Sequence, residues 1–329
     1  MKRAAALLLA LLLLASAGCA APKTLRQQTI FAMNTVMDLR IYASDDSLLQ
    51  EMTRLLSELD HELSATEAGS ALYALNQTGQ AENADLAQIV SRASAISDET
   101  GGALDISLYN ASLAWGFPTG EHRVPDEAEL AALRRTIGLD KVAVSGDVVT
   151  LSDGVKLDFG AVAKGLAADL CREKMENAGV SGILSLGASI QTVGTKPDGS
   201  DWSIGVQDPE DPSNIKLTLR LKGSKAVVTS GDYQRFFEQD GVRYCHILDP
   251  ETLAPVQSDY RSVTIVADSG FLADGLSTAL YVMGFEAGVS LWRTSGGFEA
   301  VWIADDGSVS VTEGLAPLVS GAEAEVIQR

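Results

Sequence analysis

The sequence is poor in the residues on which several classes of protein depend. Of its 329 residues, 3 are cysteine, 3 are histidine, 9 are proline, and 6% are aromatic. Cys19, Cys171 and Cys245 are too few for a disulfide framework, and three histidines cannot supply many metal sites. The low proline content and the 46% hydrophobic composition exclude a disordered or collagen-like chain. The length suffices for one large or two modest domains with a buried core.

Basic residues are also scarce. Lys and Arg number 25 against 44 Asp and Glu, which gives a formal net charge of −19. A nucleic-acid-binding protein needs a basic surface that displaces counterions from phosphates. The composition therefore predicts no nucleic-acid partner. An anionic ligand would have to be held by a few local cations, by backbone N–H groups or by a bound metal ion.

The first residues are typical of an exported protein. Lys2 and Arg3 precede an apolar run, 4–17, that is followed by Gly18 and Cys19. A basic start, a short apolar stretch and small residues before a cleavage point indicate a secretory signal. The run is too short to span a bilayer comfortably. A cysteine at this point resembles the lipobox of bacterial lipoproteins, although Ser16 stands where leucine is usual.

We therefore expect residues 1–18 to be a lipoprotein signal peptide, with Cys19 lipidated and residues 19–28 serving as a polar tether. The lipid would hold the following domain at the outer face of the cytoplasmic membrane. The alternative is an ordinary secretory signal with an incidental cysteine.

The hydrophobic pattern of the remaining chain predicts a mixture of helices and strands. Apolar residues alternate over 31–41 and again over 215–222, which predicts a strand in each range. Asp-Gly pairs at 240–241 and 306–307 predict hairpin turns. Helices are expected over 48–63, 86–96, 126–136, 161–178 and 271–283. Without internal repeats, this pattern favours one α+β unit, and the polar stretch 118–129 would be the joint if it has two lobes.

Four segments carry candidate functional residues. In the first, 157–165, a strand ends at Asp158, a glycine turn follows and a helix begins. A helix N-terminus offers unpaired N–H groups and a positive dipole end, so a phosphate can bind there with Lys164 reaching it. One glycine and no Lys-Ser/Thr pair distinguish this segment from a Walker loop. The alternative is a tight turn in which Asp158 caps the helix.

The second candidate comprises two polar segments, 229–233 and 244–250, on either side of the predicted hairpin. We expect them to lie side by side on paired strands. His246, three residues before Asp249 at a strand end, is suited to acid–base catalysis or to phosphate binding. The alternative is a half-buried histidine that is hydrogen-bonded to the backbone.

The third candidate is the helical segment 273–279. Asp274 and Thr278 are four residues apart and share a helix face, with Ser277 beside them. One carboxylate and two hydroxyl groups suit a hard cation such as Mg²⁺. The alternative is a helix first turn in which Asp274 favours the dipole.

The fourth candidate joins the glycine pair and carboxylate of 101–105 to the aromatic cluster of 113–117. This combination would suit a flat ring system. A packed aromatic corner of the core explains the cluster equally well.

Taken in order, these segments resemble the ApbE-type FAD:protein FMN transferases, a family of bacterial flavin transferases. The likeness extends from about Phe31 to Gly284 and also rests on residues 33–35, 70–76, 186–187, 202–209 and 262–264. It implies a compact α+β domain of the tunnelling-fold type over residues 29–329, with two lobes around an FAD cleft.

The resemblance implies an enzyme that uses Mg²⁺ to transfer the FMN part of FAD to a threonine hydroxyl of a target protein, with AMP leaving. Acceptors in this family are membrane redox subunits of the Na⁺-pumping NADH:quinone reductase and Rnf type, and related exported flavoproteins. Two alternatives remain. One is an Mg²⁺-dependent FAD pyrophosphatase that uses water, and the other is a non-catalytic FAD-binding lipoprotein.

The matching motifs also imply individual roles. Mg²⁺ would be bound by the backbone carbonyl of Ala161 and by Asp274 and Thr278, with Ser277 as a further candidate. Either His246 or Asp158 would accept the proton of the incoming threonine. FAD would contact Met33, Thr66, Ala103, Leu104, Asp105, Asp158, Lys164 and Leu248. Three positions depart from the family pattern: Asn34 replaces a common glycine, Thr66 replaces an aromatic residue that faces the flavin, and Cys245 replaces a frequent second histidine.

Overall fold

The computed structural model describes residues 23–329. The predicted signal peptide, Cys19 and the first residues of the predicted tether lie outside the described residues. Within 23–329, no helix has both the length and the apolar character that a membrane crossing requires. Strand β1 (Thr24–Ala32) begins inside the range predicted as a tether, so that prediction was wrong for residues 24–28. These polar residues form a strand because every one of them is paired with β2 (Thr35–Ala43).

The predicted single strand over 31–41 is a hairpin. Met33 and Asn34 have φ values of 48° and 56°, and Ala32 pairs with Thr35. Two successive residues with positive φ form the two-residue turn that matches the twist of antiparallel strands. The turn reverses the chain, so Phe31 pairs with Val36 and lies on the opposite sheet face from Met37. The alternation of apolar residues continued through the turn and concealed it.

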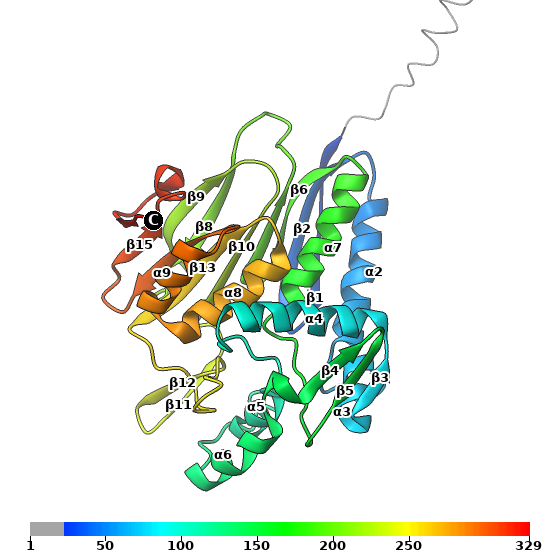
Figure 1. The fold of residues 1–329 in the computed structure, drawn as a ribbon. Coiled ribbons are helices and arrows are strands. Elements are labelled where there is room, and N and C mark those ends of the chain that lie inside the picture. Colours follow the sequence, from blue (N-terminus) through cyan, green and yellow to red (C-terminus); the bar gives the residue numbers. More distant parts are fainter. Residues whose placement is uncertain (1–22) are drawn as a thin grey trace, which may run out of the picture.

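A nine-stranded sheet runs through the described chain in the order β1-β2-β6-β7-β10-β13-β14-β15-β17 (Figure 1). Neighbouring strands are antiparallel, except for β15 and β17, which are parallel. The other strands of this sheet are β6 (Ser181–Leu186), β7 (Ser189–Val193), β10 (Lys225–Gly231), β13 (Tyr260–Ala267), β14 (Phe298–Ala304), β15 (Val309–Thr312) and β17 (Glu325–Ile327).

Helices cover one face of this sheet, and a small sheet covers the other. The apolar sides of the helices pack on the strands in two clusters of buried residues. On the opposite face, a third cluster joins Ile190 and Val227 to the small sheet. The helices are α2 (Ser47–Glu62), α7 (Ala163–Asn177), α8 (Gly270–Met283) and α9 (Phe285–Thr294), and the small sheet contains β8 (Trp202–Gln207), β9 (Ile215–Leu221) and β16 (Val319–Ser320).

A second group of elements lies below the large sheet in Figure 1. Trp115, Phe117 and Phe237 form part of an aromatic cluster there. The elements are α3 (Ala71–Thr78), α4 (Ala84–Glu99), α5 (Tyr109–Trp115), α6 (Glu127–Leu133), β3 (Gln80–Glu82), β4 (Val142–Ser145), β5 (Val148–Leu151), β11 (Phe236–Gln239) and β12 (Val242–Cys245), with the short helices η1 (Arg134–Thr136) and η2 (Leu139–Lys141). The short helix η3 (Ala316–Leu318) instead packs with the small sheet.

The pattern-based predictions for most elements are confirmed. The five predicted helices correspond to α2, α4, α6 with η1, α7 and α8, and both Asp-Gly turns close hairpins, β11–β12 and β14–β15. The prediction that 118–129 joins two lobes was wrong, because this stretch connects α5 to α6 within the lower group of elements. Its proline and polar residues reflect a surface loop rather than a boundary.

Candidate active site

One cavity of about 930 Å³ collects nearly all of the predicted site residues. Its volume lies at the upper end of the range for small-molecule sites, roughly 300–1,000 Å³. Every predicted site residue among the described residues lines it except Ser277. Those that line it are Met33, Thr66, Ala103, Leu104, Asp105, Asp158, Ala161, Lys164, His246, Leu248, Asp274 and Thr278.

Close contact between α7 and α8 places Asp274 in this cavity. A Cβ atom on Gly165 would lie 2.2 Å from the carbonyl oxygen of Gly270, so the two helices approach each other through glycines. Asp169 of α7 reinforces the contact by accepting a 2.7 Å hydrogen bond from the backbone N–H of Gly270. One turn further along α8, Oδ2 of Asp274 accepts a 2.8 Å hydrogen bond from the N–H of Gly165.

Asp274 is a buried carboxylate that faces the cavity. Its exposed fraction is 4%. Burial raises its pKa, and the nearby charge of Lys164 and the N–H of Gly165 act in the opposite direction. A carboxylate in this setting is stabilised in its ionised form by a bound cation.

The carbonyl of Ala161, just before α7, is also available. Gly165 is the third residue of α7, so its N–H has no acceptor inside the helix. Here that N–H donates to Asp274 instead, and no hydrogen bond to the Ala161 carbonyl occurs among the described residues. A carbonyl oxygen, a carboxylate and the Thr278 hydroxyl thus line one cavity, and such oxygen donors suit Mg²⁺. The donor set therefore fits this ion.

Ser277 differs from the other predicted ligands. It is completely buried and does not line the cavity. Its hydroxyl donates to the Asp274 carbonyl at 2.9 Å and lies 2.8 Å from the hydroxyl of Ser230. The Ser230 hydroxyl lies 3.4 Å from that of Thr278. The structure therefore corrects the Ser277 prediction, because the helix turns this side chain away from the cavity. Its hydroxyl instead contacts Ser230, which in turn contacts Thr278.

Within residues 23–329, no group of three or more His, Cys, Asp or Glu side chains is arranged to hold a metal ion. A cation at this site would consequently depend on backbone and hydroxyl oxygens together with the single carboxylate of Asp274.

His246 and Lys164 also meet in the cavity. The backbone N–H of His246 donates to the carbonyl of Arg235, and its Nδ1 lies 3.2 Å from the same oxygen. Since a carbonyl only accepts, Nδ1 carries the hydrogen and Nε2 retains a lone pair. Burial, followed by the charges of Arg235 and Lys164, lowers the pKa of His246 well below its usual value. The imidazole is therefore neutral at neutral pH.

Asp158 does not cap α7, although that was the alternative reading of its position. Its Oδ1 accepts a 2.6 Å hydrogen bond from the N–H of Gly160, inside the turn before the helix. The N-cap residue of α7, Val162, makes no side-chain hydrogen bond. Asp274 caps α7 instead, by accepting a hydrogen bond from the N–H of Gly165. The carboxylate of Asp158 remains on the cavity wall.

The two polar segments around the β11–β12 hairpin are not paired with each other, contrary to expectation. Strand β10 pairs with β7 and β13, whereas β12 pairs with β11. Ser230 and His246 nevertheless both line the cavity.

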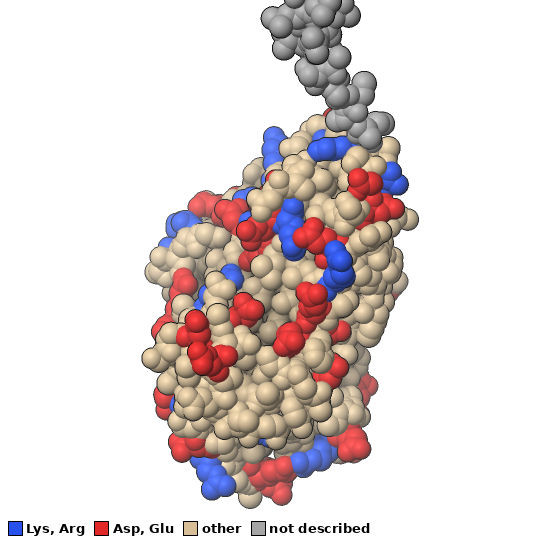
Figure 2. Space-filling view, turned by 90° about the vertical axis from the view of Figure 1, so that its right-hand side faces the viewer, with Lys and Arg blue, Asp and Glu red and all other residues tan. Residues whose placement is uncertain are grey.

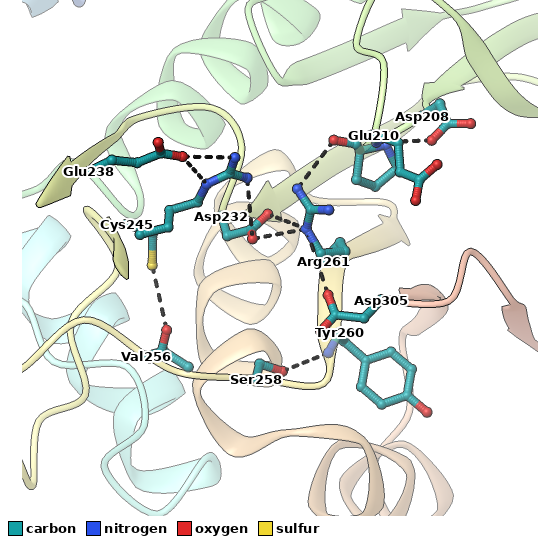
Figure 3. Close-up of polar contacts among 12 residues, drawn as sticks. Asp208, Glu210, Asp232, Glu238, Cys245, Val256, Ser258, Tyr260, Arg261 and Asp305 are labelled. Carbon is teal, nitrogen blue, oxygen red and sulfur yellow. Dashed lines mark hydrogen bonds and ion pairs between the residues drawn. The ribbon is translucent and has the colours of Figure 1, made fainter. Parts of the chain in front are cut away.

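An ion pair fixes the segment that follows β10. The Nε of Arg261 lies 2.9 Å from both carboxylate oxygens of Asp232 (Figure 3). The same guanidinium donates to the carbonyl of Pro209 at 3.3 Å. These contacts connect the β8–β9 loop to the segment that carries Ser230 and Tyr233 on the cavity wall.

The sequence reasoning missed several cavity residues. Tyr109 lines the cavity, and its hydroxyl donates to the carbonyl of Ala65 at 3.2 Å, next to Thr66. Arg235 also lines the cavity, and it belongs to none of the motifs noted in the sequence. Phe117 belongs to the aromatic cluster noted in the sequence and supplies a second ring. Tyr109 and Phe117 are thus two aromatic residues on the wall of the same cavity as Thr66.

The molecular surface bears interspersed charges on the face seen in Figure 2. Lys174 of α7 and Glu51 of α2 form an ion pair, with 2.6 Å between Nζ and Oε1. On this face the basic side chains form no continuous patch.

Comparison with known proteins gives a consistent picture. The ApbE family model matches residues 33–302. FAD:protein FMN transferases of Vibrio cholerae and Treponema pallidum are 31% and 32% identical over 294 and 321 residues, which cover 85% and 90% of this chain and 87% and 89% of the relatives.

Solved structures are similar over the same extent. The ApbE protein of Thermotoga maritima superposes with a TM-score of 0.84 at 28% identity, covering 90% of this chain and 99% of the other. The flavinyl transferase ApbE of Pseudomonas stutzeri superposes with a TM-score of 0.81 at 30% identity, covering 92% and 98%. With the cavity and its residues in place, these matches show that the chain belongs to the ApbE family.

Proposed function

We propose that this protein transfers FMN from FAD to a threonine hydroxyl of another protein, in an Mg²⁺-dependent reaction that releases AMP. The observation that carries the proposal is the meeting of Lys164, His246, Asp274 and the free Ala161 carbonyl in one cavity of about 930 Å³. The names of the relatives, FAD:protein FMN transferases, support the same activity.

The reaction breaks the bond between the FMN phosphorus and the bridging oxygen that leaves with AMP. A new bond joins that phosphorus to the threonine Oγ. Lys164, together with the N-terminal end of α7, would hold the negatively charged phosphates. Mg²⁺ bound by Ala161, Asp274 and Thr278 would supply positive charge to the phosphate oxygens.

His246 is the group that we assign to accept the threonine proton. It is neutral, and its Nε2 has a free lone pair because Nδ1 donates to Arg235. The bound pyrophosphate would raise the low pKa of this imidazole, since a nearby negative charge favours the protonated form. Asp158, whose Oδ1 already accepts from Gly160, would instead orient FAD.

We also propose the wider setting from the sequence. Residues 1–18 would direct export, and lipidated Cys19 would hold the domain at the outer face of the cytoplasmic membrane. Redox proteins at that membrane, of the NADH:quinone reductase or Rnf type, would be the acceptors. The two-lobed tunnelling-fold description is likewise a proposal, supported by the cavity lying between the large sheet and the lower elements.

Incubation of the protein with FAD, Mg²⁺ and an acceptor domain tests this function. Mass spectrometry should show FMN on an acceptor threonine, AMP should appear in equal amount, and EDTA should prevent both. AMP release that is equally fast without acceptor would favour the pyrophosphatase. FAD that stays intact in every mixture would favour a non-catalytic binding protein.

A further inference from the structure

Three large hydrophobic side chains are unusually exposed. Phe31, Val36 and Ile215 are 72%, 61% and 56% exposed, the highest values for such side chains in the described part of the chain. Phe31 and Val36 face each other across the β1–β2 hairpin, and we refer to them as the apolar pair. The two side chains do not contribute to the core, because neither belongs to a cluster of buried residues.

The apolar pair lies directly beside the cavity. Ala32 and three further residues separate Phe31 from Val36. These three, Met33, Asn34 and Thr35, line the cavity. The pair itself does not, so it forms a surface next to the cavity rather than part of its wall.

Strand register places the apolar pair on the same sheet face as two residues of the cavity wall. Val36 and Asp38 share a face because they are two residues apart. Asp38 pairs with Ser185 of β6, and Ser185 pairs with Ile190 of β7. Ser185 and Ile190 both line the cavity.

Ile215 belongs to the same region. It lines the cavity at the start of β9, and its Cδ1 lies 2.6 Å from the position of a Cβ on Gly205. The β8–β9 sheet packs on the sheet face that carries Ile190. Ile215 therefore lies at the cavity on the same side of the large sheet as the apolar pair.

The free edge of the sheet indicates what kind of partner fits. Strand β1 has β2 as its one strand neighbour among the described elements, and it forms one edge of the sheet in Figure 1. Its outward backbone N–H and C=O groups can pair with an added extended segment. A polypeptide can use both features, the edge and the apolar side chains, whereas a dinucleotide cannot pair with a strand edge.

We propose that the apolar pair and Ile215 dock the acceptor polypeptide, with apolar residues beside its modified threonine resting on Phe31 and Val36. This inference rests on the proposed function, because transfer requires the acceptor to enter the cavity from outside. Docking at this surface would lead the threonine toward His246 and the phosphates.

The double variant Phe31→Ser/Val36→Ser tests the proposal. The matched control is Leu25→Ser, which lies on the same strand and face at 52% exposure but six residues from Phe31. We expect the KM for the acceptor to rise about tenfold or more in the double variant, the usual effect of losing an apolar anchor. The kcat, the Kd for FAD and the melting temperature should be unchanged, and the control should match the wild type.

An unchanged KM for the acceptor would overturn the proposal. A weaker Kd for FAD would overturn it in favour of a flavin-binding role for the pair. Loss of a wild-type dimer in size-exclusion chromatography, or of binding to phospholipid vesicles, with the acceptor KM unchanged would assign the surface to a second copy or to a membrane. If the wild-type protein modifies no acceptor while it hydrolyses FAD, the proposed function itself fails, and this outcome is separable from the others.

Discussion

The carboxylate of Asp274 accepts a 2.8 Å hydrogen bond from the backbone N–H of Gly165. This contact joins the interior of α8 to the first turn of α7. It caps an N-terminus that lacks a side-chain cap of its own, next to the Ala161 carbonyl, which accepts no hydrogen bond among the described residues. One side chain thus stabilises the fold and supplies one of the oxygen ligands of the candidate cation site.

Substitutions at Asp274 should separate these two roles. Asp274→Asn keeps an oxygen that accepts from Gly165 but loses the charge, so we expect a melting temperature close to the wild type and a fall in kcat on the order of 100-fold. Asp274→Ala also removes the cap and should lose a further 0.5–2 kcal/mol of stability, about the usual cost of a missing cap. Thermal melts and FMN-transfer assays over a range of Mg²⁺ concentrations provide the measurement. Full activity of Asp274→Asn would contradict the assignment.

The glycine contact between α7 and α8 should tolerate no side chain. In Gly165→Ala, the new methyl group would lie 2.2 Å from the Gly270 oxygen and 2.7 Å from Cβ of Asp274, which forces the helices apart. We expect a loss of about 1–3 kcal/mol in the free energy of unfolding, together with reduced Mg²⁺ affinity. Gly296→Ala is the control, because a Cβ there meets nothing within 4 Å. Equal denaturation midpoints for the two variants would refute this account.

Removal of the Lys164 charge should mainly weaken FAD binding. A charge-assisted contact contributes about 1.5–3 kcal/mol, so Lys164→Ala should raise the Kd for FAD roughly 10- to 150-fold. Isothermal titration calorimetry with FAD gives this value. Lys222→Ala, an exposed lysine outside the cavity, should bind like the wild type. An unaltered titration for Lys164→Ala would rule out the phosphate contact.

Adjacent positions on α8 should respond differently to loss of a hydroxyl. Thr278→Val retains the shape of the side chain and should weaken Mg²⁺ binding, since the Thr278 hydroxyl lines the cavity. Ser277→Ala should keep Mg²⁺ dependence while losing about 1 kcal/mol of stability from its hydrogen bonds to Asp274 and Ser230. Mg²⁺-dependent shifts in melting temperature distinguish the two variants. Equal loss of the Mg²⁺ response in both would return Ser277 to the ligand set.

The imidazole of His246 should titrate well below the value of about 6.5 that is usual for histidine. Its pKa is lowered by burial and by the charges of Arg235 and Lys164. At a pH between the lowered pKa of His246 and about 6.5, the unfolded chain binds a proton that the folded protein does not. The stability of the folded protein should therefore decline as the pH falls below about 6.5. The decline should be smaller in His246→Asn. NMR titration of the imidazole, assigned with that variant, should also show an upward shift when FAD binds, and a midpoint near 6.5 without FAD would contradict the prediction.

The helices were predictable because the pattern that indicates them is local in the sequence. The spacing of Leu48, Met52 and Leu56 gives a helix the same apolar side whatever it packs against. The pairing of α8 with α7 was not predictable in this way. It depends on a backbone approach of Gly165 to Gly270, more than a hundred residues apart, and hydrophobic periodicity carries no information about such contacts.

The strand over 31–41 shows how local pattern reading fails. Alternation from Phe31 through Met37 suggested one buried face, but the turn at Met33 and Asn34 moves Phe31 to the other face. Aside from this turn, the motifs predicted which residues lie together, since all but one of the predicted site residues among the described residues line one cavity.

The sequence alone identified the family, from the order of its motifs. It also identified the candidate phosphate-binding turn and the acidic residue suited to a cation, because the chemistry of a side chain follows from its residue type. Only the folded chain decided that Ser277 faces inward while Thr278 faces the cavity, and that Ala161 retains a free carbonyl. These outcomes follow from the geometry of two helices in contact, which determines the groups that remain available to a ligand.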